Sequence, residues 1–238
     1  GSFSCLDILV SISPSNIFNL KKNNFVKKNN DIFILSKGHS AIALYSVLNS
    51  KKLSKNYEIK NFHKPGGLLT EHPSPNPKLP GIEIETGSLG NGIGMGVGIA
   101  YVEKKKSIIV LVGDGELYEG SNWEAMMSAS HYDLKNLLVI VDRNYSITLD
   151  KTENVIKLEN LKKKIQAFGF NTDVVDGHDY KKIIQNLKKF KKRKNDKPSC
   201  IIFKTIKGRG SRVLEGNLKF HHSVPNEKEY IKILSDLN

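Results

Sequence analysis

The stretch SIIVLVGDG, residues 107–115, decides the expected fold. Residues 107–112 are mostly apolar and β-branched, which is typical of a buried strand. The strand runs directly into Gly113-Asp114-Gly115. Glycines let the backbone approach a bulky anion closely, and a carboxylate offers a hard oxygen to a divalent cation. These residues therefore predict a strand whose carboxyl end carries a ligand site.

The sequence on both sides of this strand alternates between helical and strand patterns. Helices are predicted near residues 4–12, 41–48, 119–131, 161–168 and 180–192, and further strands at 137–141, 172–175 and 200–204. Residues 63–81 are rich in proline and predict an extended loop, and residues 20–30 a mobile surface segment. Strand, helix and strand in repetition indicate an α/β fold with a parallel sheet, right-handed crossovers and flanking helices. We expect one domain over residues 1–238, with ligands beyond the carboxyl ends of the strands.

A second polar group follows the next strand. Asn144 closes the segment Asp142-Arg143-Asn144, and 28 residues separate it from Gly115. One strand–helix–strand unit fills that distance and places Asp114 and Asn144 on neighbouring strand ends. A carboxylate, an amide oxygen and a nearby carbonyl could share one Mg²⁺, which takes its remaining ligands from phosphates and water. Gly-Asp-Gly alone could be a simple turn, but the second strand end favours a clamped diphosphate.

Composition limits the classes of protein to consider. The 238 residues are 39% hydrophobic, and no apolar run is long enough to span a membrane. Cys5 and Cys200 form no disulfide framework, and we expect a cytoplasmic protein. The net charge of +13 suits nucleic acid, acidic lipid or a phosphorylated ligand. Only four residues are arginine and no basic patch is interleaved with aromatics, so we expect a solvated lysine surface, with neither nucleic acid nor membrane as partner.

Several motifs in this order resemble the N-terminal, thiamine-diphosphate-binding half of the transketolase family. They are residues 35–40 (LSKGHS), 86–92 (TGSLGNG), 113–144, 176–179 (DGHD) and 204–210 (KTIKGRG). Together they extend over most of the chain. The resemblance implies the thiamine-diphosphate-binding fold, with thiamine diphosphate and Mg²⁺ as cofactors.

The resemblance also implies roles for individual residues. Asp114, Asn144 and the Ser146 carbonyl would hold Mg²⁺, whereas the Gly115 amide, His39 and Asn144 would contact the diphosphate. The cofactor's rings would be lined by Gly87, Ser88 and Leu89. Glu119 matches a glutamate that meets its symmetry mate across the subunit interface. His72 matches a histidine beside the donor sugar, and His221 lies near a histidine region that borders the substrate.

The other histidines and the glycine series have simpler interpretations. His63, His131, His178 and His222 are expected to be surface or capping groups. Glycines 90, 92, 94, 96 and 98 do not have the spacing of a dinucleotide-binding fingerprint, so we expect close packing against a cofactor or partner. Met126 and Met127 are expected in the core.

The implied activity is ketol transfer, in which a two-carbon unit passes from a ketose, or its phosphate, to an aldose. The family carries its activating glutamate and its sugar-phosphate arginines in a second domain, which nothing here resembles. We therefore expect one half of a split transketolase, either a subunit or a fragment, that is active only with a C-terminal, pyrimidine-binding partner and assembles as a homo- or hetero-oligomer. Three alternatives remain: a basic binding module, a non-catalytic assembly protein, or another thiamine-dependent carboligase or 2-ketoacid dehydrogenase α-type subunit.

Overall fold

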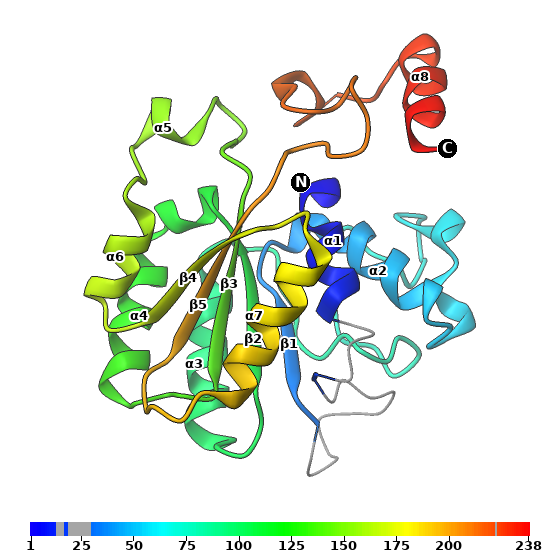
Figure 1. Ribbon diagram of the computed structural model, residues 1–238. Coiled ribbons are helices and arrows are strands. Elements are labelled where there is room, and N and C mark those ends of the chain that lie inside the picture. Colours follow the sequence, from blue (N-terminus) through cyan, green and yellow to red (C-terminus); the bar gives the residue numbers. More distant parts are fainter. Residues whose placement is uncertain (13–16, 19–29, 222) are drawn as a thin grey trace.

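The sheet is five-stranded and entirely parallel, with strand order β1-β2-β3-β5-β4 in the computed structural model (Figure 1). The structure describes residues 1–12, 17–18, 30–221 and 223–238. The strands are β1 (Ile32–Leu35), β2 (Ile108–Gly113), β3 (Leu137–Arg143), β4 (Asn171–Asp176) and β5 (Ser199–Lys204). Every residue of β2 and β3 is buried, because helices cover both faces of the sheet centre.

Two helical layers enclose the sheet (Figure 1). On one face, α1 (Ser2–Ile12), α2 (Ala41–Ser50) and α7 (Tyr180–Lys192) pack over side chains such as Ile109, Leu111 and Ile140. On the other, α3 (Asn91–Val102), α4 (Gly120–His131) and α6 (Leu161–Ala167) pack over Val110, Val139 and their neighbours. The alternation of side chains along each strand divides the core in this way. The expected α/β architecture is confirmed.

Each helix and strand expected from the pattern is present within a few residues of its predicted bounds. The pattern did not reveal β1, α3, the short α5 (Thr152–Val155) or the terminal α8 (Glu227–Leu237). The predicted loop at 63–81 holds no helix or strand. The prediction for residues 20–30 falls outside the described residues except at its last position, and His222 also lies outside them. Cys5 and Cys200 are buried free thiols. Among the described residues, no helix is long and apolar enough to cross a membrane.

The glycine series runs from the N-cap of α3 into the helix, and part of it packs on this chain's own sheet, whereas packing against a cofactor or partner stays a prediction. A Cβ at Gly92 would lie 2.1 Å from the Ser36 hydroxyl oxygen, and one at Gly96 would lie 2.5 Å from a methyl carbon of Val110. Gly94 and Gly98 face the other way, with nothing within 4 Å of an added Cβ. The prediction for methionine is half wrong, since Met126 is buried but Met127 is 55% exposed.

We expect Gly96→Ala to destabilise the chain, because its methyl group would overlap Val110. Overpacking of this kind costs about 1–3 kcal/mol, against a helix-propensity gain of about 0.5–1 kcal/mol. The control, Gly94→Ala, keeps the gain without the overlap and should raise stability. Urea unfolding of both variants measures the difference. Equal stabilities would contradict the packing of α3 on β2.

Candidate functional site

Asp114 and Asn144 follow neighbouring strands, as their spacing predicts. Gly113 at the end of β2 pairs with Asp142 of β3, and the Asp114 amide donates to the Asp142 carbonyl at 3.2 Å. The Asp114 carboxylate is 2% exposed and accepts hydrogen bonds from the amides of Gly115, at 2.9 Å, and Tyr145, at 2.7 Å. The carboxylate is therefore bonded to the turn that follows Asn144.

Asn144 and Ser146 lie together in that turn. The Asn144 amide oxygen accepts from the Ser146 backbone N–H at 3.1 Å, and its Nδ2 donates to the Ser4 hydroxyl at 3.2 Å. In the described part of the chain, no three His, Cys, Asp or Glu residues gather as a metal cluster. A cation here would need a mixed set of carboxylate, amide and carbonyl oxygens, which is the type that Mg²⁺ accepts.

Burial shifts the electrostatics of Asp114. Desolvation and the nearby Asp142 carboxylate raise the pKa of Asp114 to about 6, although Arg143 and the Tyr145 amide oppose the shift. Two buried carboxylates side by side make a cation favourable between or beside them. The site is therefore prepared for positive charge, from protein or from metal.

A buried ion pair, which the sequence did not reveal, lies behind this turn. Lys37 Nζ and Asp142 Oδ2 are 2.5 Å apart, and both side chains are almost completely buried. Asp142 also accepts from the hydroxyls of Ser4, at 2.7 Å, and Thr205, at 2.5 Å. Burial alone would lower the pKa of Lys37, but the Asp142 carboxylate reverses this and raises it. Lys37 therefore stays charged behind the candidate site.

Lys207 is a second buried lysine, although we expected the lysines to lie on a solvated surface. It is 4% exposed and its ammonium contacts Nδ1 of His221. Burial and the charge of Lys37 lower the pKa of Lys207 to about 8, while Asp114 opposes them. A buried lysine whose pKa is lowered toward neutral pH is typical of a position where an anion would bind. His221 also bonds to the Thr148 hydroxyl at 3.2 Å through Nε2.

The predicted histidine segments meet at one place. A Cβ at Gly38 would lie 3.0 Å from Cδ2 of His72, and one at Gly87 would lie 3.1 Å from the same atom. His39 lies in the 3₁₀ turn (Gly38–Ser40) that precedes α2. Desolvation and the nearby Lys37 charge lower the pKa of the His39 imidazole, which is exposed at its outer edge, so the ring is neutral near pH 7. His72 and residues 85–88 also line an open cavity of about 420 Å³.

Glu116 connects the strand ends to α3, a role that the sequence did not reveal. Its carboxylate accepts from the Ser36 hydroxyl, from the Gly90 amide at 3.0 Å and from the Gly113 amide at 3.1 Å. Glu119 lies at the exposed end of this region, where its Cβ would be 2.6 Å from a Cβ added at Gly90. Ser88 and Leu89 are exposed beside it. These predicted ring-lining and interface residues are therefore exposed near the start of α3, and their roles stay predictions.

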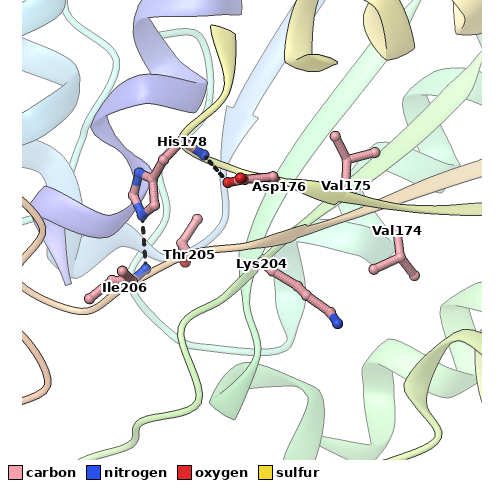
Figure 2. Close-up of a pocket in the computed structure, with 7 residues that line it drawn as sticks. All are labelled: Val174, Val175, Asp176, His178, Lys204, Thr205 and Ile206. Atoms are coloured by element: carbon pink, nitrogen blue, oxygen red, sulfur yellow. Dashed lines mark hydrogen bonds between the residues drawn. The ribbon is translucent and has the colours of Figure 1, made fainter. Parts of the chain in front are cut away.

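A second depression lies at the carboxyl ends of β4 and β5 (Figure 2). His178 is fixed there, because its Nε2 accepts from the Ile206 amide at 2.9 Å and its Nδ1 contacts Asp7 at 2.6 Å. His178 therefore caps a backbone amide, which is one of its two expected roles, although its side chain is only 11% exposed. Figure 2 shows Lys204 pointing away from His178, so the polar groups do not converge on one point. The DGHD motif anchors the segment that leads to Lys207.

Comparison with known proteins places the chain in a family. Residues 14–236 match the family model described as transketolase, thiamine diphosphate binding domain. The chain therefore belongs to the transketolase family, through its thiamine-diphosphate-binding domain.

Two kinds of relatives are informative. One subunit of the apulose-4-phosphate transketolase of Phocaeicola vulgatus is 34% identical over 242 residues, covering 100% of this chain and 85% of that protein. Human transketolase is 39% identical over 197 residues, 81% of this chain and 31% of the relative. Among solved structures, transketolase from Leishmania mexicana superposes with a TM-score of 0.85 at 27% identity, over 97% of this chain and 36% of its own. The chain thus spans about a third of the solved transketolases it matches.

We expect the affinity for thiamine diphosphate to fall as Lys207 loses its proton. The ammonium attracts the diphosphate only when charged, so affinity is full below the pKa of about 8 and declines above it. At one pH unit above this pKa, the affinity should be about tenfold lower than at one unit below it. Lys207→Met should bind more weakly at neutral pH and should not show this decline. Because the ligand's own titration affects both proteins equally, the difference between their pH profiles reports on Lys207. Titration calorimetry across this range measures both, and parallel pH profiles would contradict a role for Lys207.

Proposed function

We propose that this chain is the N-terminal subunit of a split transketolase that transfers a two-carbon ketol unit from a ketose, or its phosphate, to an aldose or its phosphate. The apulose-4-phosphate transketolase relatives are themselves named as subunits and match this chain over its whole length, which supports the division. The observation that carries the proposal is the meeting of Asp114, Asn144 and the buried lysines at the ends of β2 and β3.

Mg²⁺ would be held by the Asp114 carboxylate, the Asn144 amide oxygen and the Ser146 carbonyl. Two features of this chain fit a cation: hard oxygens in one turn, and a raised Asp114 pKa that a positive charge would reverse. The Gly115 amide donates to Asp114 and so holds the carboxylate for its ligand. The residues therefore fit the metal that the family implies.

The diphosphate would lie between the metal ligands and the cationic side of the site. Lys207 and Lys37 supply positive charge there, and Asn144 and His39 supply hydrogen-bonding groups. The Gly115 amide donates to Asp114 in this structure, so it would contact the diphosphate only by giving up that bond. Gly87, Ser88 and Leu89 would line the aminopyrimidine and thiazolium rings. Bound thiamine diphosphate supplies the carbanion chemistry of ketol transfer.

His39, His72 and His221 would handle protons and hydroxyl groups of the sugar. The neutral His39 imidazole can accept a hydrogen bond at neutral pH, whereas its lowered pKa makes it a weak proton acceptor in this structure. His72 lies beside Gly87 at the open cavity, where a sugar could reach it from solvent. His221 is bonded to Lys207, so its orientation depends on the same lysine that would face the diphosphate.

The partner would be a C-terminal transketolase subunit that carries the pyrimidine-binding domain. We place the assembly in the cytoplasm, because two buried free thiols suit a reducing compartment. A second thiamine-dependent reaction, such as carboligation or 2-ketoacid dehydrogenation, is the alternative; His39 and His72 favour sugar substrates over it.

We expect the chain to transfer ketol units when mixed with its partner subunit, thiamine diphosphate and Mg²⁺. Asp114→Asn should lower the rate about 100-fold or more, because it removes the charged metal ligand. Asp196→Asn, at an exposed ion pair with Lys135, is the control and should keep the wild-type rate.

Ketose donors assayed against 2-ketoacids separate the two thiamine-dependent reactions. Full activity in Asp114→Asn would contradict the metal assignment. Turnover of 2-ketoacids alone would contradict ketol transfer. Tight RNA or DNA binding that weakens steeply with salt and ignores Asp114→Asn would favour a basic binding module instead.

The chain would also pair with a second copy through the exposed side of α3 and α4. Helix α3 carries no charged residue, and Met95, Tyr101 and Val102 are exposed along it. Met127 and Tyr132 extend the same apolar surface over the end of α4. The open space at Gly94 and Gly98 would let another helix approach closely. An exposed apolar surface of this kind is typical of a protein interface.

We expect Met127→Glu to weaken this association, since it places a charge in the apolar centre of the interface. Val224→Glu adds the same charge at a residue that is 88% exposed elsewhere, and should leave assembly unchanged. Sedimentation velocity of the chain with its partner subunit measures the assembly size. A Met127→Glu protein with the wild-type sedimentation coefficient would contradict the α3–α4 interface.

A further inference from the structure

Arg143 is a fully buried arginine that the function described above does not use. It is the last residue of β3 and only 1% exposed. Its guanidinium pairs with three carboxylates: Asp114 at 3.0 Å, Glu153 at 2.6 Å and Glu159 at 3.2 Å. One side chain therefore connects the proposed metal ligand to two acidic residues of the segment 150–160.

The two ends of the guanidinium serve different parts of the chain. Nη1 donates to Asp114 Oδ2 and to the Thr152 hydroxyl at 2.7 Å, whereas Nη2 donates to Glu153 and Glu159. Glu153 also accepts from the Leu158 amide at 3.1 Å. A planar fork can hold both groups at once, which a single ammonium cannot. The segment 150–160 is thus tied to Asp114 through one residue.

The turn after Arg143 is shaped around the same contact. Tyr145 has φ of 61°, an uncommon conformation for an aromatic residue. Its amide donates to Asp114 Oδ2, and its ring lies 4.2 Å from the Arg143 guanidinium carbon. Backbone held in a rare conformation persists where the surroundings fix it, often at functional sites. Arg143 and Asp114 together hold the turn that presents Asn144 and Ser146.

These bonds also decide which oxygen of Asp114 has room for a ligand. Oδ2 accepts from both Arg143 and Tyr145, whereas Oδ1 accepts from the Gly115 amide alone. A carboxylate oxygen has about two lone-pair sites, so Oδ1 keeps one for a cation. Glu153 and Glu159 compensate the arginine's charge on its far side. The guanidinium can therefore orient Asp114 while its own charge is shared with other carboxylates.

We propose that Arg143 is a positioning residue that fixes the Asp114 carboxylate for its cation and couples cation binding to the order of the segment 150–160. The proposal rests on the proposed function, because it takes Asp114 as a metal ligand. It adds a distinct claim: residues that touch no cofactor, Glu153 and Glu159, influence the affinity for the metal through Arg143.

The test uses Mn²⁺ as the probe, titrated by electron paramagnetic resonance into the full chain with thiamine diphosphate and its partner subunit. Arg143→Lys keeps the charge but loses the fork, and should raise the Kd for Mn²⁺ about tenfold or more, as loss of an orienting partner does. Arg193→Lys is the matched control. Arg193 is also largely buried and ion-paired, with Asp173, but it follows α7 at the opposite ends of the strands.

A role through charge alone gives a different result. In that case Arg143→Lys would bind Mn²⁺ as wild type does, and Arg143→Met would bind it more tightly because a repelling charge is gone. A role in folding alone would lower the melting temperature of Arg143→Lys and leave the Kd unchanged. Either result would overturn the proposal.

Limited trypsin digestion tests the coupling independently, because Lys151 and Lys157 are exposed in the tied segment. We expect Mn²⁺ with thiamine diphosphate to slow cleavage there in the wild type. Glu159→Gln, at a side chain that is 51% exposed, should keep the fold but lose much of this protection. Equal protection in Glu159→Gln and wild type would overturn the coupling.

The metal assignment and the Arg143 proposal can be contradicted separately. If the wild type binds no Mn²⁺, or if Asp114→Asn binds it equally well, the metal assignment fails and the Arg143 proposal falls with it. If Asp114→Asn abolishes binding while Arg143→Lys leaves the Kd unchanged, only the Arg143 proposal is overturned.

Discussion

The buried ion pair between Lys37 and Asp142 is the interaction on which the rest of the site depends. Lys37 follows β1 and Asp142 lies in β3, so the pair joins strands that β2 separates. Ser4 of α1 and Thr205 after β5 complete the bonding of Asp142. Breaking such a pair by removing one partner typically costs about 3–5 kcal/mol, because the other charge stays buried. The pair thus joins the ends of β1 and β3 to α1 and to the segment after β5 that carries Lys207.

Buried charge at the ends of the strands would let a basic chain bind an anionic cofactor at one place rather than over its whole surface. Most of its lysines are exposed, as composition suggested, and contribute little to a specific site. Lys37 and Lys207 are different because they are buried beside two carboxylates. Water screens their charges less, so a diphosphate with its cation can interact with them strongly. Arg143 is also buried and paired with carboxylates, and it connects Asp114 to the segment 150–160.

Much of the fold could be predicted because β2, β3 and β5 are continuous apolar runs and α7 has a strongly one-sided pattern. Helix α3 could not be predicted, since its alternating glycines lack the side chains that reveal helical periodicity. Close approach to Ser36 and Val110 accounts for Gly92 and Gly96. Strand order was also inaccessible, because β5 inserts between β3 and β4 through contacts distant in sequence. The neighbouring positions of Asp114 and Asn144 could be predicted from strand-end spacing, while their role as metal ligands stays a prediction. Lys37, Lys207 and Glu116 could not be identified in this way, because the burial of a charged side chain is known only once the positions of its partners are known.

We infer that Asp114 and Asn144 would together hold one cation beside a diphosphate. Anomalous diffraction from a crystal soaked with Mn²⁺ and thiamine diphosphate can test this inference. We expect a single strong anomalous peak within ligand distance of the Asp114 carboxylate, the Asn144 amide oxygen and phosphate oxygens. A diphosphate bound at the strand ends with no metal between it and Asp114, or a metal held by other residues, would contradict it.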